Sequence, residues 1–99
     1  MIAHVTWGKI KPGTWYEFQR LWQEYSASEN GAGAKGRLLL RDGVTPDAGY
    51  SISLWESEDA FRSFIAANPP PKAMQDCFVG QYVTTRTEVA GSTFAGIDA

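Results

Sequence analysis

The sequence predicts one small α+β domain with the element order β-α-β-β-α-β. The chain has 99 residues, of which 43% are hydrophobic and 20% are charged, and this composition is typical of a globular protein with a single core. Segments rich in β-branched and aromatic residues alternate with two segments in which apolar residues recur at helical spacing. Turn signals that contain Gly and Pro separate these segments.

A first strand over residues 2–10 and a first helix over residues 14–28 open the predicted fold. The strand ends at a Lys-Pro-Gly turn signal. Thr14 and Glu17 have the spacing of a capping box, in which each side chain satisfies a free backbone N–H group. The segment 30–34 is expected to end the helix, and the overlapping Gly-rich run 31–36 is interpreted as a flexible connection and a candidate lid. The apolar stripe of the helix contains Trp15, Phe18, Trp22 and Tyr25.

Two strands follow. Residues 37–41 are a short apolar run that predicts the second strand, and residues 42–49 predict a connecting loop. Residues 50–55 alternate with period two, which predicts a third strand with two different faces. One face holds Tyr50, Ile52 and Leu54. The other face holds Ser51, Ser53 and Trp55.

The second helix is expected after Ser57, a good N-cap, and is expected to end at Asn68 and the prolines 69–71, because proline lacks the N–H group that continues a helix. Residues 72–77 are ambiguous and fit one further helical turn. Residues 78–89 predict the last strand. The domain is therefore expected to span residues 1–90, followed by a tail of residues 91–99 that is either flexible or packed on a partner subunit.

This order of elements is that of a ferredoxin-like sandwich, in which two helices cover one face of a four-stranded antiparallel sheet. We expect Tyr50, Ile52 and Leu54 to face the helices. The more polar His4 and Thr6 are expected on the helix-free face, together with Ser51, Ser53 and Trp55. An error of one residue in the register would reverse this assignment.

The helix-free face needs an explanation of its own. Four Trp, four Tyr and five Phe are a heavy aromatic load for one small core. Either the face is merely wetted by solvent, or it meets a second sheet or surrounds a ligand space. The aromatic content favours the second interpretation, and an identical subunit is the expected neighbour.

Composition excludes several classes of protein. A net charge of −2 argues against nucleic-acid binding, and no apolar run reaches the roughly 20 residues of a membrane-spanning helix. The N-terminus lacks the pattern of a signal peptide, so a cytoplasmic location is expected. One His and one Cys without ligand spacing do not indicate a metal site, and the single Cys77 is expected to be a half-buried structural thiol.

Four segments carry a resemblance to a known family. They are the turn at residues 10–13, the aromatic-rich first helix, the run 36–42, and above all the run from Ser53 to Phe61. That last run is similar to a junction of strand, Trp, acidic cap and helix. Together these segments resemble the antibiotic biosynthesis monooxygenase (ABM) domain family of the dimeric α/β-barrel superfamily, over about residues 2–89.

The resemblance implies a homodimer whose sheets pack face to face, with a cavity between sheet and helices in each subunit. It also implies a monooxygenase without metal, flavin or haem, which takes a proton from a small aromatic or polyketide-like compound and lets the carbanion react with O₂. No branch of the family is matched in full, so the alternative is a non-catalytic ligand-binding or interaction module on the same fold. A fold alone does not establish a reaction.

Haem degradation is the third alternative. The haem-degrading branch of the superfamily uses an Asn on the first strand, a Trp on the second helix and a His shortly after it. The matching positions here look like Thr6, Phe64 and Met74, none of which has the required type.

The candidate catalytic residues are His4, Trp55 and Tyr82, and the candidate substrate-binding residues are Thr6, Ser53, Phe64, Met74 and Arg86. Histidine exchanges a proton near neutral pH, so His4 is the candidate general base; the alternative is a strand histidine with one hydrogen bond. Trp55 is a candidate substrate wall or proton relay, and the alternative is a packing residue. Tyr82 is a candidate to hold a phenolate or orient O₂, and the alternative is an aromatic cross-strand pair. Arg86 neutralises an anionic substrate or is an edge or rim charge. Arg37 and Arg41 are expected to be solvated.

Overall fold

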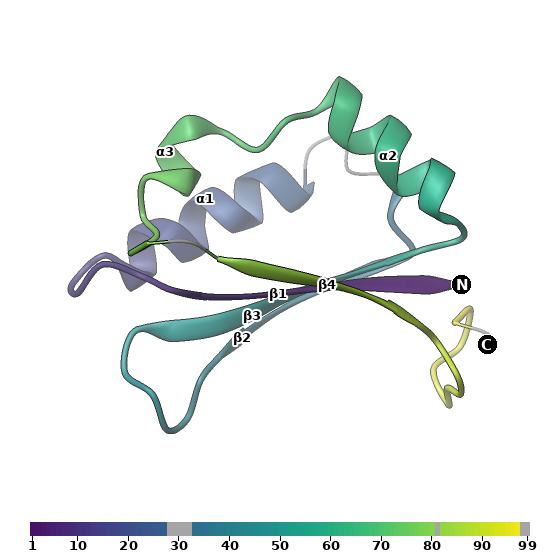
Figure 1. Ribbon diagram of the computed structural model, residues 1–99, viewed down its shortest axis with the longest axis horizontal. Helices are drawn as coiled ribbons and strands as arrows, with labels where there is room; N and C mark the ends of the chain where they lie inside the picture. Colours follow the sequence, from purple (N-terminus) through teal and green to yellow (C-terminus); the bar gives the residue numbers. More distant parts are fainter. Residues whose placement is uncertain (28–32, 81, 98–99) are drawn as a thin grey trace.

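The computed structural model describes residues 1–27, 33–80 and 82–97. Its four antiparallel strands form one open sheet in the order β2-β3-β1-β4, and the helices lie on one side of that sheet (Figure 1). The predicted α+β, ferredoxin-like architecture is confirmed. No helix in the described part of the chain is long and apolar enough to cross a membrane.

The elements follow the predicted order, with one short helix added. They are β1 (Ile2–Lys9), α1 (Trp15–Ala27), β2 (Gly36–Arg41), β3 (Ala48–Trp55), α2 (Glu58–Ala67), α3 (Lys72–Gln75) and β4 (Val83–Glu88). The ambiguous residues 72–77 thus contain α3. The predicted start of the last strand at residue 78 is wrong, because Gly80 has a φ of 71°, which turns the chain before β4. The predicted end of the first helix at residue 28 and the first two residues of the candidate lid lie outside the described residues, which resume at residue 33.

The predicted N-terminal cap is confirmed for α2 but not for α1. Ser57 caps α2 as predicted, since its side chain accepts a hydrogen bond from the backbone N–H of Ala60. The predicted capping box of α1 does not form among the described residues. The Thr14 hydroxyl instead donates to the carbonyl of Lys11, and the Glu17 carboxylate pairs with Arg20.

The predicted assignment of the sheet faces is reversed in the structure. His4, Thr6 and Trp55 lie on the helix side, where His4 contacts Glu58 of α2. The helix-free side holds Leu38, Ile52 and Leu54 instead. The reason is that the helix side forms the floor of a cavity and therefore carries small polar residues, whereas the apolar strand positions face away from the helices.

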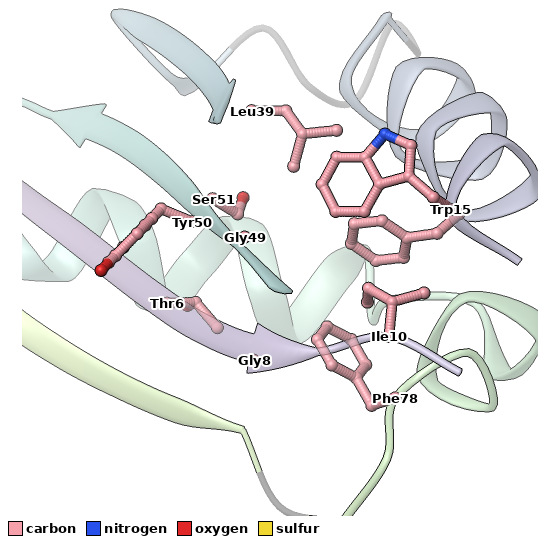
Figure 2. A pocket seen from close by; sticks show the side chains of 10 residues that line it. Thr6, Gly8, Ile10, Trp15, Leu39, Gly49, Tyr50, Ser51 and Phe78 are labelled. Carbon is pink, nitrogen blue, oxygen red and sulfur yellow. The ribbon is translucent and has the colours of Figure 1, made fainter. Parts of the chain in front are cut away.

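Aromatic rings from the helix layer lie directly on the sheet at its glycines. Gly8 and Gly49 are opposite one another on β1 and β3. A Cβ atom at Gly49 would lie 2.7 Å from the Trp15 ring, and one at Gly8 would lie 2.6 Å from the Phe78 ring. Figure 2 shows these rings gathered on one side of the sheet, while Tyr50 points away from them. Only glycine allows rings to approach the backbone this closely.

The buried core forms two clusters under the helices. One cluster lies at the α1 and α3 end and contains Ile10, Trp15, Phe18, Met74 and Cys77. The other lies under α2 and contains Ile2, Trp55 and Phe64. Phe18 of the first cluster and Trp55 of the second also line a cavity between the sheet and the helices.

The helix-free face of the sheet is apolar and partly exposed. Its exposed side chains include Leu38, Leu40, Tyr50 and Val83. The described part of the C-terminal tail lies on this side of the sheet (Figure 1), and Ile97 is buried there beside Ile52 and Leu54. Packing of the tail on a partner subunit stays a prediction.

Candidate active site

A cavity of about 300 Å³ lies between the sheet and the helices. This volume is at the lower end of the range of small-molecule sites, about 300–1,000 Å³. Its walls are largely aromatic and include Phe18, Trp22, Tyr25, Trp55, Phe61, Phe78 and Tyr82. The cavity therefore suits a flat, apolar ligand of one or two rings.

The floor of the cavity is a polar strip across the sheet. Its first row crosses all four strands, because the register pairs Arg37 with Ser53, Ser53 with His4, and His4 with Arg86. In the next row Ser51 pairs with Thr6, and Thr6 pairs with Thr84. The hydroxyl groups of Thr6 and Thr84 are 2.9 Å apart. Period-two alternation thus places hydroxyl, imidazole and guanidinium groups under an aromatic roof.

Two serine hydroxyls hold two of the indole rings. The Trp22 Nε1–H group donates to Ser51 Oγ at 2.9 Å, and the Trp55 Nε1–H group donates to Ser53 Oγ at 2.8 Å. A serine hydroxyl that accepts one hydrogen bond still has its own proton to donate. These serines can therefore orient the walls and also bind a ligand oxygen.

His4 is the buried titratable group of the cavity floor. The residue is 9% exposed, and its ring lies edge-on to Phe61 with 3.6 Å between ring centroids. Its Nε2 atom lies 3.1 Å from Glu58 Oε2. A carboxylate only accepts hydrogen bonds, so Nε2 carries the proton in the neutral ring and Nδ1 has the lone pair. Nδ1 is buried and has no hydrogen-bond partner among the described residues.

Two arginines hold the carboxylate that orients His4. Arg86 Nε lies 3.3 Å from Glu58 Oε2, and Arg62 Nε lies 3.5 Å from Glu58 Oε1. Glu58 therefore contacts two guanidinium groups as well as the imidazole of His4. This arrangement of a base oriented by a third group is the general pattern of acid–base sites.

The structure brings six of the eight candidate site residues together. Those that line the cavity are His4, Thr6, Ser53, Trp55, Met74 and Tyr82. The other two have different places. Phe64 is buried in the core behind Trp55, and Arg86 holds Glu58 at the rim.

Glu58 and Arg37 are two site residues that are not among the sequence-based candidates. Glu58 contacts His4. The prediction that Arg37 is solvated is wrong, since it is half-buried and lines the cavity. Strand alternation carried the signal for Arg37, because it shares a face with Leu39, which lies next to Ser51.

Arg41, also expected to be solvated, has an exposed side chain that stacks over Trp15 with 5.0 Å from its guanidinium carbon to the ring centroid. Cys77 is buried, and its thiol donates to the carbonyl of Ala73 at 3.4 Å. Burial raises the pKa of this thiol, which disfavours the reactive thiolate. A structural role for Cys77 agrees with the prediction.

The described residues do not fit a haem site of the kind used by the haem-degrading branch. The position expected to supply a histidine is Met74, and the position expected to supply a tryptophan, Phe64, lies in the core behind the cavity. The single histidine of the chain, His4, is held by Glu58 instead.

No protein-family model and no curated protein sequence matches the chain. Solved structures do match over most of its length. A protein from Caulobacter crescentus CB15 with a provisional description as an antibiotic biosynthesis monooxygenase superposes with a TM-score of 0.75 at 20% identity, covering 90% of this chain and 89% of its own.

Two further structures have descriptions that name a ligand or an activity. A mutant of SnoaB from Streptomyces nogalater, described as a cofactor-independent oxygenase, has a TM-score of 0.76 at 18% identity and covers 93% of this chain and 95% of its own. A mutant of MhuD, with two manganese protoporphyrin IX molecules bound per active site, has a TM-score of 0.71 at 22% identity. The match covers 96% of this chain and 100% of that structure's chain. At sequence identities this low, the superpositions show only that the folds are alike. The chain therefore has the fold of the antibiotic biosynthesis monooxygenases, as the sequence resemblance implied.

Proposed function

We propose that the protein is a cytoplasmic, homodimeric, cofactor-independent monooxygenase that acts on a small aromatic compound in the cavity between its sheet and helices. The observation that carries the proposal is the hydrogen bond from His4 to Glu58 at the floor of an aromatic cavity. A buried imidazole with an oriented ring and a free Nδ1 is suited to remove a proton from a bound substrate. The shared fold with SnoaB supports the same class of reaction.

The reaction begins with a proton transfer. His4 takes a proton from an acidic C–H group that is activated by a neighbouring phenol or ketone, and the positive imidazolium is stabilised by Glu58. The hydroxyl groups of Ser53 and Thr6 line the same cavity and can donate to the oxygen on which negative charge develops. The protein itself therefore binds the substrate, orients it and supplies one proton acceptor.

The substrate carbanion then reduces O₂, which is the oxidant. A carbon–oxygen bond forms to give a hydroperoxide, which accepts a proton. Its O–O bond breaks as a second proton leaves the same carbon, which releases water and leaves a carbonyl group. Overall one CH₂ group and one O₂ give one C=O group and one H₂O, so both atoms of oxygen are accounted for.

The test is oxygen uptake by purified protein that has been treated with a chelator, with a panel of anthrone-like and phenolic substrates. Uptake should exceed the uncatalysed oxidation, the His4→Gln variant should reduce it towards that background, and a Val44→Ala variant in the exposed β2–β3 turn should keep it. Absence of uptake across the panel would contradict the proposal.

Ligand binding without turnover is the second candidate function. It is favoured by the absence of a complete motif from any one branch of the family. Thr6, Phe64 and Met74, for example, lack the groups that the haem-degrading branch uses. Saturable binding of an aromatic ligand without oxygen uptake by any member of the panel would support it over catalysis.

The proposed homodimer rests on the helix-free face of the sheet. Leu38 and Val83 are 51% and 59% exposed there, and Leu40 and Tyr50 are also exposed. Exposed apolar side chains that share one sheet face are typical of an interaction surface. A second copy of this chain supplies the same flat apolar face, and two such faces bury one another about a twofold axis.

A further inference from the structure

Arg37 is a cation held among aromatic rings. Its guanidinium carbon lies 5.7 Å from the ring centroid of Tyr25, 5.2 Å from that of Trp55 and 5.0 Å from that of Phe64. Cation–π contacts of this kind orient a guanidinium group but supply no hydrogen-bond acceptor in the plane of its N–H groups. No carboxylate in the described part of the chain forms an ion pair with Arg37.

Two hydrogen-bond donors of Arg37 are buried without a partner. They are the Nε and Nη2 atoms, neither of which contacts an acceptor among the described residues. These two N–H groups lie on the same edge of the guanidinium plane and form the fork that binds a carboxylate through two parallel hydrogen bonds. Buried charged donors without an acceptor are unfavourable, so an acceptor from outside the chain would relieve that cost.

Arg37 also lies in register with the proposed base. Both it and His4 are cross-strand partners of Ser53, and both line the same cavity. Neighbouring strands are about 4.8 Å apart, so two strand spacings place the backbones of Arg37 and His4 about 10 Å apart.

We infer that Arg37 is the anion-recognition residue of the cavity and that the substrates are aromatic carboxylates. The carboxylate binds the Nε and Nη2 fork of Arg37, and the ring lies on the aromatic walls with its acidic group toward His4. The assignment of the far end of the substrate to His4 rests on the proposed oxygenase function, whereas the anion subsite does not. Burial lowers the pKa of the Arg37 guanidinium, which nevertheless stays charged at neutral pH.

The test is a comparison of two probes by titration calorimetry at neutral pH. 6-Hydroxy-2-naphthoate has the carboxylate, and 2-naphthol has the same ring system and hydroxyl group without it. The wild-type protein should bind the naphthoate at least about tenfold more tightly. Arg37→Gln should remove that preference while leaving the affinity for 2-naphthol within about twofold, and Arg37→Lys should keep part of it because a point charge lacks the fork.

Arg41→Gln is the matched control. Arg41 is on the same strand and also stacks on aromatic rings, those of Trp15 and Tyr16, but it is not among the residues that line the cavity. This variant should bind both probes as the wild-type protein does. Circular dichroism of all variants checks that they are folded, and Arg37→Lys serves if Arg37→Gln does not fold.

The outcomes separate the inference from the proposed function. Equal affinity for the two probes, an Arg37 variant that weakens both alike, or no binding of either probe would overturn the anion subsite. A preference for the naphthoate that depends on Arg37 supports the anion subsite, even if no substrate consumes oxygen. Absence of oxygen consumption would count against the proposed oxygenase function alone.

Discussion

His4 on β1 and Glu58 at the start of α2 are joined by a hydrogen bond of 3.1 Å, although they are 54 positions apart in the chain. The same carboxylate oxygen, Oε2, lies 3.3 Å from Arg86 Nε on β4. Glu58 therefore links three elements and fixes the ring of the one histidine in the chain. This relationship gives the first prediction.

Replacement of His4 by Gln should lower the rate of oxygen uptake by about 10²–10⁴-fold, because a positioned base contributes a factor of that size. Replacement of Glu58 by Gln should cause a smaller loss, since the base remains and only its orientation is weakened. The rate at saturating substrate and the substrate dissociation constant should be measured separately, and the loss should fall mainly on the rate.

Added imidazole distinguishes a chemical role of His4 from a structural one. A His4→Gly variant leaves space for a small base, so imidazole in the buffer should restore part of its activity. Added imidazole should restore no activity to the Glu58→Gln variant. If imidazole has no effect on His4→Gly while the variant still binds substrate, His4 is not the base.

Light scattering at micromolar concentration should give about twice the chain mass of 10.9 kDa. Leu38→Lys places a charge on the apolar helix-free face and should shift the protein toward the monomer, because an unpaired charge is costly to bury in an interface. Val44→Lys is the control, since Val44 is 91% exposed in the β2–β3 turn and should leave the mass unchanged. A wild-type protein that is a monomer would refute the dimer.

Gly49→Ala should lower the free energy of unfolding by about 1–3 kcal/mol, the usual cost of overpacking a core. The added methyl group would lie 2.7 Å from the Trp15 ring and 2.6 Å from the carbonyl oxygen of Leu40, and the backbone oxygen cannot easily move. Gly43→Ala is the matched control, because no atom lies within 4 Å of the added group there. Urea unfolding of both variants provides the comparison, and equal stabilities would contradict the packing argument.

Asp42 should make folding sensitive to acid. Its carboxylate accepts hydrogen bonds from the backbone N–H groups of Thr45 and Val44 at 2.9 and 2.8 Å, and these bonds lower its pKa in the folded state. Because the folded pKa lies below the unfolded one, the stabilisation is present above the unfolded pKa and is lost as pH falls through the folded pKa.

The Asp42→Asn variant tests this effect, since the amide keeps an oxygen acceptor but does not titrate. It should be less stable than the wild-type protein near neutral pH, and the difference should shrink below about pH 4. Free energies of unfolding from about pH 3 to pH 7 would show this convergence. A constant difference over that range would show that Asp42 does not contribute through its charge.

Local patterns in the sequence were sufficient for most of the elements. Ser57 and Asn68 bound α2 as predicted, because an N-cap hydroxyl and a run of prolines act on their immediate neighbours. The start of β4 was misjudged because the turn at Gly80 is required by the path of the chain and not by the apolar pattern of the segment.

The orientation of the sheet could not be obtained from the same patterns. The usual rule places apolar strand residues toward the helices, and it failed here because the helix side is a cavity floor. Ser51 and Ser53 bind the indole N–H groups of Trp22 and Trp55, so polar residues are satisfied under the helices. Alternation distinguishes two faces but does not state which of them the helices cover.

The amino-acid sequence by itself determined the order of the elements and the caps of α2, because these depend on periodicity and on neighbours in the chain. Only the tertiary structure decided that Arg37 lies among aromatic rings and that Glu58 holds His4. The local sequence around a charged residue near the end of a strand does not show whether its side chain contacts water or a buried ring. Its environment is set by helices that come from elsewhere in the chain.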